Sequence, residues 1–374
     1  MIEVNEVIIH RLKMPLQMRF ETSFGVQTDR DLLLIEVLAS DGTIGWGECV
    51  AAYRPVYSEE TTDSAESVLI NELIPLVFGR NWEHPSEFFP VSACLRGNRM
   101  AKFALEGALW DIHAQQNKMS LATAIGGKKL AVDVGVSIGI MPIEELLKEV
   151  ADYHAQGYRR IKIKIKPGWD IEPIRIIREH FPDLPLMGDA NAAYKREDFK
   201  ILRQLDNYGL MMIEQPLAEH AWVDCAELQS QLHTPICLDE SIHSVEDLDL
   251  AVSLKACRIV NVKLGRIGGI QAALELSAKA RAANIALWSG GMLETGVGRA
   301  FNVALATLDG YTLPGDTASS RRYWKPDIIE PEVIVENGQI KVPTTAGLGY
   351  AVSRTKIGSY QIMQKHFRKG RGNV

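Results

Sequence analysis

Five ionisable residues recur through the middle of the chain at nearly constant intervals. They are two lysines and three acids, each at the end of a short apolar run: Lys164, Asp189, Glu214, Asp239 and Lys263. The gaps between them are 25, 25, 25 and 24 residues, the length of one strand–helix unit. A charged group in an apolar strand is costly to bury unless it is paired or binds a metal. We therefore expect these five side chains to converge on one site.

The three acids of this series favour a hard divalent cation. Asp189, Glu214 and Asp239 supply carboxylate oxygens, with no Cys or His among them. Such ligands select Mg²⁺, with Mn²⁺ as a substitute, over Zn²⁺. The cation would neutralise a substrate carboxylate and the enolate that forms when the adjacent proton leaves. An ion-pair cluster with the lysines is the alternative interpretation.

The lysines suit proton transfer. In the run 161–166 (IKIKIK), strand alternation puts the isoleucines on one face and the lysines on the other. In a closed barrel the isoleucines pack against outer helices, so Lys162 and Lys164 point inward. The like charge of Lys162 and the bound cation would make Lys164 a usable base near neutral pH. Lys263, from a strand across the barrel, would approach the opposite face of the substrate.

The elements that must position these residues form a repeating pattern from about residue 132 onward. Short β-rich runs alternate with amphipathic helical stretches. The expected strands are 132–140, 160–165, 184–189, 210–214, 235–239, 259–264, 285–289 and 311–314. The expected helices are 142–155, 171–180, 198–208, 245–255, 270–283 and 296–308. Eight strands alternating with helices predict a closed parallel α/β barrel, with its active site at the C-terminal ends of the strands.

The two ends of the chain have a different character. The segments 2–12, 32–38 and 44–50 are expected to be antiparallel strands, with a hairpin turn at Asp41-Gly42. Helical patterns follow at 59–77 and 100–116. A further hairpin is expected at 333–342, around Asn337-Gly338, where it could rejoin the N-terminal strands.

Composition narrows the class of protein. The chain has 374 residues and a net charge of −6, and its only basic block, 365–371, is typical of a solvated tail, so no nucleic-acid partner is expected. Five scattered cysteines without a CxxC pair argue against a disulfide framework or a zinc site, and for a reducing compartment. Neither a leader sequence nor an apolar span of about 20 residues is present. We expect a cytoplasmic protein with a small-molecule carboxylate substrate and no membrane partner.

A set of short motifs resembles the enolase superfamily, in its muconate-lactonizing-enzyme subgroup. The motifs are Lys162-x-Lys164, Asp189-Ala-Asn191, Glu214-Gln-Pro216, Asp239-Glu240-Ser241 and Asn261-Val-Lys263. The resemblance covers essentially the whole chain. It implies an α+β capping domain at 1–125, a (β/α)7β modified TIM barrel at 126–325, and a C-terminal segment, 326–374, that packs back on the cap.

Five further stretches narrow the resemblance to one branch. The first, 45–48, resembles the capping-domain hairpin. The others, 165–170, 291–294, 314–316 and 322–324, are similar to o-succinylbenzoate synthases that also act as N-acylamino acid (N-succinylamino acid) racemases. The resemblance implies Mg²⁺ held by the three acids, and Lys164 as the base for syn dehydration in menaquinone biosynthesis. Lys263 would stabilise the enolate and act as the second acid or base in racemisation, with Lys162 beside them.

The same resemblance assigns supporting residues. Asn191 and Glu240 would orient ligands and lysines, and an arginine at the position of Arg266 accompanies racemase activity, so a dual activity is expected. The implied substrate contacts are Phe20, Ser23, Phe24, Tyr53, Ser137, Gly291, Met292, Glu294 and Asp316. Phe20 and Phe24 fit a core position equally well. A homo-oligomer is expected, with the number of subunits left open.

Alternatives remain within and outside this branch. A muconate cycloisomerase shares the lysine and acid pattern. A dipeptide epimerase would present Asp-x-Asp after the eighth strand, where only Asp316 stands, and a mandelate racemase would carry His on the seventh. A Schiff-base aldolase using Lys164 or Lys263 would leave the three acids idle. A non-catalytic barrel would be expected to lack at least one of the five residues.

Overall fold

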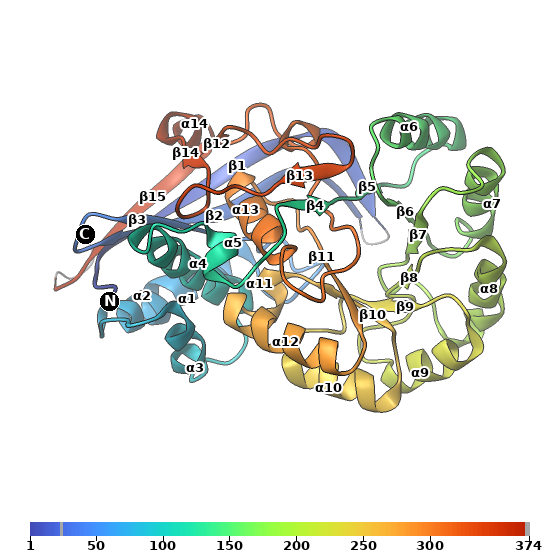
Figure 1. The fold of residues 1–374 in the computed structure, drawn as a ribbon, viewed down its shortest axis with the longest axis horizontal. Coiled ribbons are helices and arrows are strands. Elements are labelled where there is room, and N and C mark those ends of the chain that lie inside the picture. The colour runs from blue at the N-terminus through green and yellow to red at the C-terminus, as the bar shows by residue number, and fades with distance from the viewer. Residues whose placement is uncertain (23–24, 371–374) are drawn as a thin grey trace.

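The computed structural model describes residues 1–22 and 25–370. Ser23 and Phe24, two of the predicted substrate contacts, lie outside the described residues. The elements form a sheet-and-helix domain beside a curled parallel sheet that is ringed by helices, and both described ends of the chain lie on the side of the first domain (Figure 1).

The first domain is built on an antiparallel sheet of four strands. Its order is β15-β1-β2-β3, with β1 at Val4–Thr22, β2 at Gly25–Ala39, β3 at Ile44–Cys49 and β15 at Gln361–Arg368. The predicted N-terminal strands are confirmed, although β1 and β2 extend much further than their apolar runs. This extension carries the hairpin from the capping domain toward the barrel (Figure 1).

Helices cover one face of this sheet. They are α1 (Thr62–Val68), a π-helical turn (Leu69–Leu73), α2 (Ile74–Phe78), α3 (Phe88–Ser92), α4 (Arg99–Gln116) and α5 (Leu121–Ala124). The long helix α4 packs closely against β3, because Gly45 and Gly47 offer no side chain there. A Cβ atom built on Gly47 would lie 1.9 Å from the carbonyl oxygen of Ala104.

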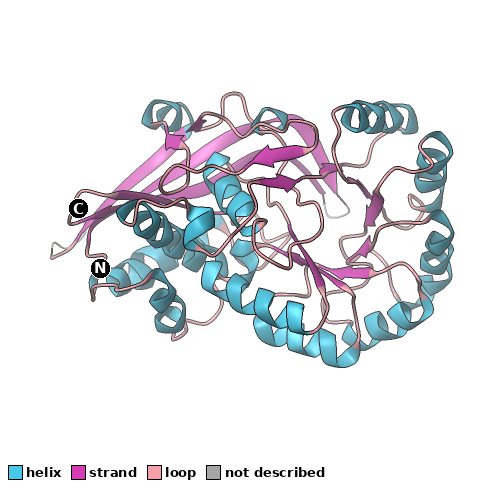
Figure 2. Cartoon of the chain, viewed as in Figure 1, coloured by secondary structure: helices cyan, strands magenta, loops and turns pink. Residues whose placement is uncertain are grey.

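The second domain contains seven parallel strands. They run in the order β11-β10-β9-β8-β7-β6-β5, with bounds Val136–Ile138 (β5), Ile161–Lys164 (β6), Leu186–Asp189 (β7), Ile213–Glu214 (β8), Ile236–Leu238 (β9), Ile259–Val262 (β10) and Ala286–Ser289 (β11). Helices follow the strands: α6 (Ile143–Ala155), α7 (Ile171–His180), α8 (Phe199–Gln204), α9 (Trp222–Gln231), α10 (Val245–Leu254), α11 (Leu264–Ile267), α12 (Ile270–Ala282) and α13 (Gly296–Leu305). Most of them line the outside of the curled sheet (Figure 2).

The predicted eighth strand, 311–314, is not a strand. Tyr311 forms one isolated parallel bridge with Leu287, and Gly315 forms another with Val134 on the far side of the sheet. These bridges close the ring without a regular ladder. Pro314 lies between them and has no backbone N–H to donate, which limits the pairing of this segment.

The predicted first strand, 132–140, divides into two. Ala131–Asp133 (β4) pairs with Gln339–Lys341 (β13), and only Val136–Ile138 joins the barrel. The turn at Asn337–Gly338 is therefore right, but its expected partner is wrong, because β15 is the strand that rejoins the N-terminal sheet. The remaining C-terminal elements are β12 (Ile329–Glu330), β14 (Ala351–Val352) and α14 (Arg354–Tyr360).

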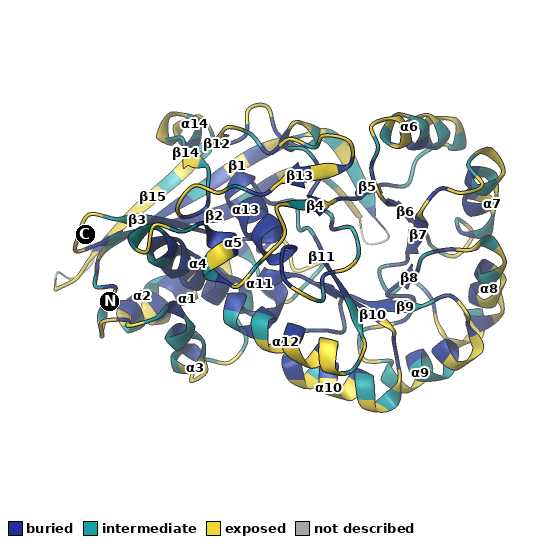
Figure 3. Ribbon diagram, in the orientation of Figure 1, coloured by how far each residue is buried: buried dark blue, intermediate teal, exposed yellow. Residues whose placement is uncertain are grey.

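Side-chain direction follows the predicted alternation in β6, where all four residues are buried. Ile161, Ile163 and Ile165 belong to the core beneath the outer helices, while Lys162 and Lys164 face the barrel interior among the acids. The helices are buried on the sides that face the strands and exposed on the outer sides (Figure 3). Over 1–22 and 25–370, no helix has the length and apolar character needed to cross a membrane.

Candidate active site

Strand register brings the predicted acids together. Lys164 pairs with Asp189 across β6 and β7, and Asp189 with Glu214 across β7 and β8. Asp239 directly follows β9, the next strand of the sheet. All three acids are buried, with at most 1% of their surface exposed. The even spacing in the sequence therefore becomes a single row at the C-terminal ends of the strands.

The two lysines of β6 contact this row from one side. Lys164 Nζ lies 2.6 Å from Asp189 Oδ2 and donates to Asn191 Oδ1 at 2.8 Å. Lys162 Nζ lies 3.3 Å from Asp189, 3.1 Å from Glu214 and 2.6 Å from Asp316. Burial lowers the pKa of Lys162, but these carboxylates outweigh it and raise that pKa well above its usual value.

Lys263 contacts the other end of the row. Its Nζ lies 2.8 Å from Asp239 Oδ2 and donates to the Tyr57 hydroxyl at 2.7 Å. Arg266 pairs with the second oxygen of Asp239 and also donates to the Tyr57 hydroxyl, at 2.8 Å. Burial raises the pKa of Asp239, but Arg266 and Lys263 outweigh it and hold that pKa well below its usual range.

Asn191 and Glu240 connect the two halves of the site. Asn191 Nδ2 donates to Glu240 Oε1 at 2.8 Å, while its carbonyl accepts from Lys164. Burial, with the charge of Asp239, raises the pKa of Glu240 to about 7. Asn191 therefore links Lys164 to Glu240 through two hydrogen bonds, and its role in orienting the lysine stays a prediction.

The three acids of the row are the candidate ligands for a divalent cation. In the described part of the chain, no group of three or more His, Cys, Asp or Glu side chains is placed to hold a metal ion as it stands, because lysine and arginine groups lie on the acid oxygens. The donor chemistry nonetheless fits, since Asp189, Glu214 and Asp239 are hard oxygen ligands on neighbouring strands. Burial and the Asp189 charge raise the pKa of Glu214 to about 8.

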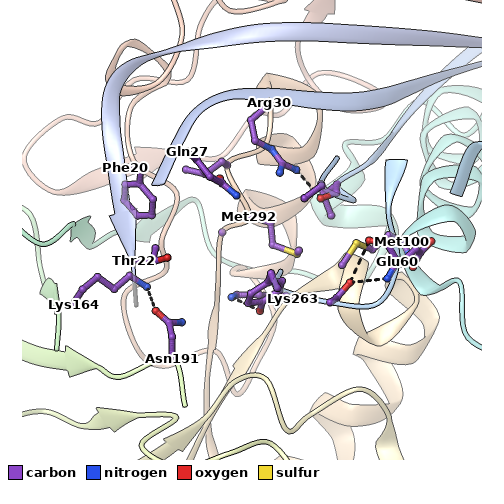
Figure 4. Close-up of a pocket in the computed structure, with 16 residues that line it drawn as sticks. Phe20, Thr22, Gln27, Arg30, Glu60, Met100, Lys164, Asn191, Lys263 and Met292 are labelled. Atoms are coloured by element: carbon purple, nitrogen blue, oxygen red, sulfur yellow. Dashed lines mark hydrogen bonds between the residues drawn. The ribbon is translucent and has the colours of Figure 1, made fainter. Parts of the chain in front are cut away.

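Two adjoining chambers lie above the acids. The outer chamber, of about 630 Å³ including its open mouth, is lined by Phe20, Met100, Gly291 and Met292, with Lys164 and Lys263 at its base. In Figure 4, Arg30 and Gln27 lie at the top of this chamber, Lys164 lies at the lower left with Asn191, and Lys263 lies at the lower centre. The inner chamber, of about 470 Å³, is lined by Ser137, Lys162, Asp189, Glu294 and Asp316 and shares Lys164 and Lys263 with the outer one.

One of the predicted substrate contacts, Tyr53, lies outside both chambers. Tyr53 is 63% exposed and lines a separate surface hollow, not either chamber. Tyr57, four residues later in the same loop, lines the outer chamber instead. The direction of a loop side chain is not set by periodicity, so the sequence indicated the loop but not which of its tyrosines lines the chamber.

Arginines near the site were also missed. Arg160 pairs with Asp316 at 2.6 Å, Arg299 lines the inner chamber, and Arg30 from β2 lines the outer one. Of these three, only Arg160 had a usable signal: it lies two residues before Lys162 and therefore on the same inward face. Asp316 lines the inner chamber but is already engaged by Arg160 and Lys162, and its contact with substrate stays a prediction.

Comparisons with known proteins agree with this geometry. Residues 3–126 match the mandelate racemase / muconate lactonizing enzyme N-terminal domain, and 145–356 match the enolase C-terminal domain-like family. The chain is 50% identical over 369 residues to an o-succinylbenzoate synthase of Geobacillus kaustophilus, and the match covers 98% of each chain. It is 47% identical over 339 residues to an N-succinylamino acid racemase of Thermus thermophilus, and that match covers 90% of this chain and 92% of the relative. A solved enolase-superfamily structure from Listeria innocua matches with a TM-score of 0.96 and 41% identity, over 99% of this chain and 100% of the other. The chain therefore belongs to the enolase superfamily, in its mandelate racemase and muconate lactonizing enzyme group.

Proposed function

We propose that this protein catalyses Mg²⁺-dependent removal of the proton adjacent to a carboxylate. The observation that carries the proposal is the pair of lysines at the base of the two chambers, Lys164 and Lys263. Each contacts a different carboxylate of one buried acid row. Two bases on opposite sides of one pocket can remove a proton from one face of a carbon and return it to the other.

The residues have distinct parts in this reaction. Asp189, Glu214 and Asp239 would hold the cation, which when bound supplies positive charge to neutralise the substrate carboxylate and the enolate. Lys164 would take the proton, and Lys263 would stabilise the enolate or deliver a proton from the other side. Lys162, tied to Asp316 at 2.6 Å, contributes a fixed positive charge beside the acids.

We further propose both activities named among the relatives: dehydration to o-succinylbenzoate and racemisation of N-succinylamino acids. Dehydration needs one base and a stabilised enolate, whereas racemisation needs both lysines to exchange protons. The contact of Arg266 and Tyr57 with the Lys263 end of the row supports the second activity. Muconate cycloisomerisation and dipeptide epimerisation are weaker candidates, since the relatives at 44–50% identity carry neither name.

Two assays on the purified protein test the proposal. One follows formation of o-succinylbenzoate from its hydroxycyclohexadiene carboxylate precursor by ultraviolet absorbance. The other follows racemisation of N-succinyl-L-phenylglycine by polarimetry, with Mg²⁺, with Mn²⁺ and with EDTA. Metal-dependent turnover in both supports a dual activity, and turnover in neither contradicts the proposal. A cytoplasmic location and a homo-oligomeric state are proposed alongside it, the latter testable by light scattering.

A further inference from the structure

An arginine of the capping domain contributes a buried charge to the outer chamber. Arg30 lies on β2, is 5% exposed and lines this chamber. Its Nη2 donates to the Val50 carbonyl at 2.6 Å and more weakly to that of Ala51, at 3.4 Å. Its Nε is buried and has no hydrogen-bond partner. In Figure 4 this side chain lies on the cap side of the chamber, away from Lys164.

The other buried arginines near the site have clear structural roles. Arg160 and Arg266 pair with Asp316 and Asp239. Arg299 donates to two backbone carbonyls and stacks over the Tyr323 ring, 4.5 Å from its centroid. Over the described residues, no carboxylate lies within ion-pair distance of Arg30. A buried charge without a direct partner is costly, which indicates a partner that arrives with the substrate.

The chamber around Arg30 suits an anionic group. Glu60 is the one acid among the described lining residues, and both its oxygens accept from the backbone N–H groups of Met100 and Ala101 at 2.9 Å. Its charge is therefore directed toward the start of α4. The inner chamber is lined by Lys162 and by Asp189, a member of the acid row, so the reacting carboxylate belongs there under the proposed function. The remainder of a substrate must extend outward, toward Arg30.

We propose that Arg30 binds the distal carboxylate of succinyl-bearing substrates. The inference rests on the proposed function, and it gives the two activities a shared chemical basis. o-Succinylbenzoate and N-succinylamino acids differ at the reacting carbon but share a succinyl chain that ends in a carboxylate. A guanidinium group in the outer chamber recognises that end and leaves the rest of the substrate free to vary.

An experiment that removes the charge of Arg30 tests this proposal. The variants are Arg30→Gln, Arg30→Lys and, as a matched control, Arg54→Gln, which removes the same charge from an exposed position on a cap loop outside the chamber. Each is assayed with N-succinyl-L-phenylalanine and with N-butanoyl-L-phenylalanine, which has the same chain length but no distal charge.

We expect R30Q to lower kcat/KM for the succinyl substrate about 10- to 100-fold, mainly through KM. Its effect on the butanoyl substrate should stay within about twofold, R30K should recover part of the preference, and R54Q should leave it unchanged. Equal losses on both substrates, or no loss on either, would overturn the proposal. An equal loss of preference in R54Q would also overturn it, since the effect would then be a long-range field.

Two controls separate this inference from the proposed function. If R30Q does not fold, the proposal is tested by the ratio of the wild-type kcat/KM for the succinyl substrate to that for the butanoyl substrate. A ratio of at least about tenfold supports the proposal, and a ratio near one overturns it. If the wild type turns over neither substrate, the proposed racemisation fails. Calorimetric binding of o-succinylbenzoate against 2-butanoylbenzoate then tests Arg30 independently of turnover.

Discussion

Lys164 and Lys263 follow strands that have three others between them, yet their ammonium groups line the same two chambers. Lys164 lies 2.6 Å from Asp189 and Lys263 lies 2.8 Å from Asp239. Under the proposed function, the separation between the strands would place the two bases on different sides of one substrate. The acid row between them holds both side chains in place.

Removing one acid of the row should remove metal dependence together with activity. Glu214→Gln is expected to lower turnover at least about 100-fold, since the cation loses a charged ligand. Thermal unfolding with and without Mg²⁺ checks the cause: the wild type should gain stability with Mg²⁺ and E214Q should gain little. Glu275→Gln, at an exposed position on α12, is the control. Full activity in EDTA would contradict the proposed cation.

The Tyr57 hydroxyl should matter more to racemisation than to dehydration. It accepts hydrogen bonds from Lys263 at 2.7 Å and from Arg266 at 2.8 Å, and burial raises its pKa to about 12, so it stays neutral at working pH. Tyr57→Phe should slow racemisation about tenfold and dehydration by less than about threefold. Tyr53→Phe, in the same loop but exposed, should change neither rate. Equal slowing of both reactions by Y57F would contradict a specific role at Lys263.

Much of this site could be predicted because barrel geometry converts an even spacing into a convergence in space. The positions of the acid row, Lys164 and Lys263 followed from strand ends alone, and the inward face of β6 followed from the alternation of Ile161 and Lys162. Arg30 and Tyr57 could not be found this way. They reach the pocket from the capping domain, and its placement depends on packing between segments far apart in the chain. The prediction of a strand at 311–314 was wrong for a related reason, since the apolar run does not reveal how few backbone hydrogen bonds this segment makes to its neighbours.

The free energy of unfolding should fall as pH rises, because a buried acid that lies between the two domains loses its proton. Glu106 on α4 accepts from the N–H groups of Ile270 and Gln271 at the start of α12, and burial raises its pKa to about 7. A carboxyl whose pKa is raised by folding favours the folded state when protonated. Its contribution is therefore present below about pH 4.5 and lost between there and about pH 7. The melting temperature of the wild type relative to Glu106→Gln should drop by a few degrees from pH 5 to pH 8. A constant difference across this range would contradict the raised pKa.

The capping domain should not tolerate a side chain at Gly47. An added Cβ would meet the Ala104 carbonyl oxygen at 1.9 Å, so Gly47→Ala must push β3 away from α4. A loss of about 3 kcal/mol or more in the free energy of unfolding is expected, measured by urea titration. Gly358→Ala on α14 is the matched control, since no atom lies within 4 Å of its added Cβ. It should be neutral or slightly stabilising, and a similar loss in both variants would contradict the packing argument.

The most direct test of the two-lysine site is exchange of the substrate α-proton in D₂O. N-succinyl-L-phenylglycine is incubated with Mg²⁺ and the wild type, Lys164→Ala or Lys263→Ala, and the α-proton signal and the D-isomer are followed by NMR and chiral chromatography. The wild type should exchange the proton and form the D-isomer. Each variant should lose racemisation by about 10²- to 10⁴-fold while keeping a folded spectrum. Racemisation that survives in either variant would contradict proton transfer between the two lysines.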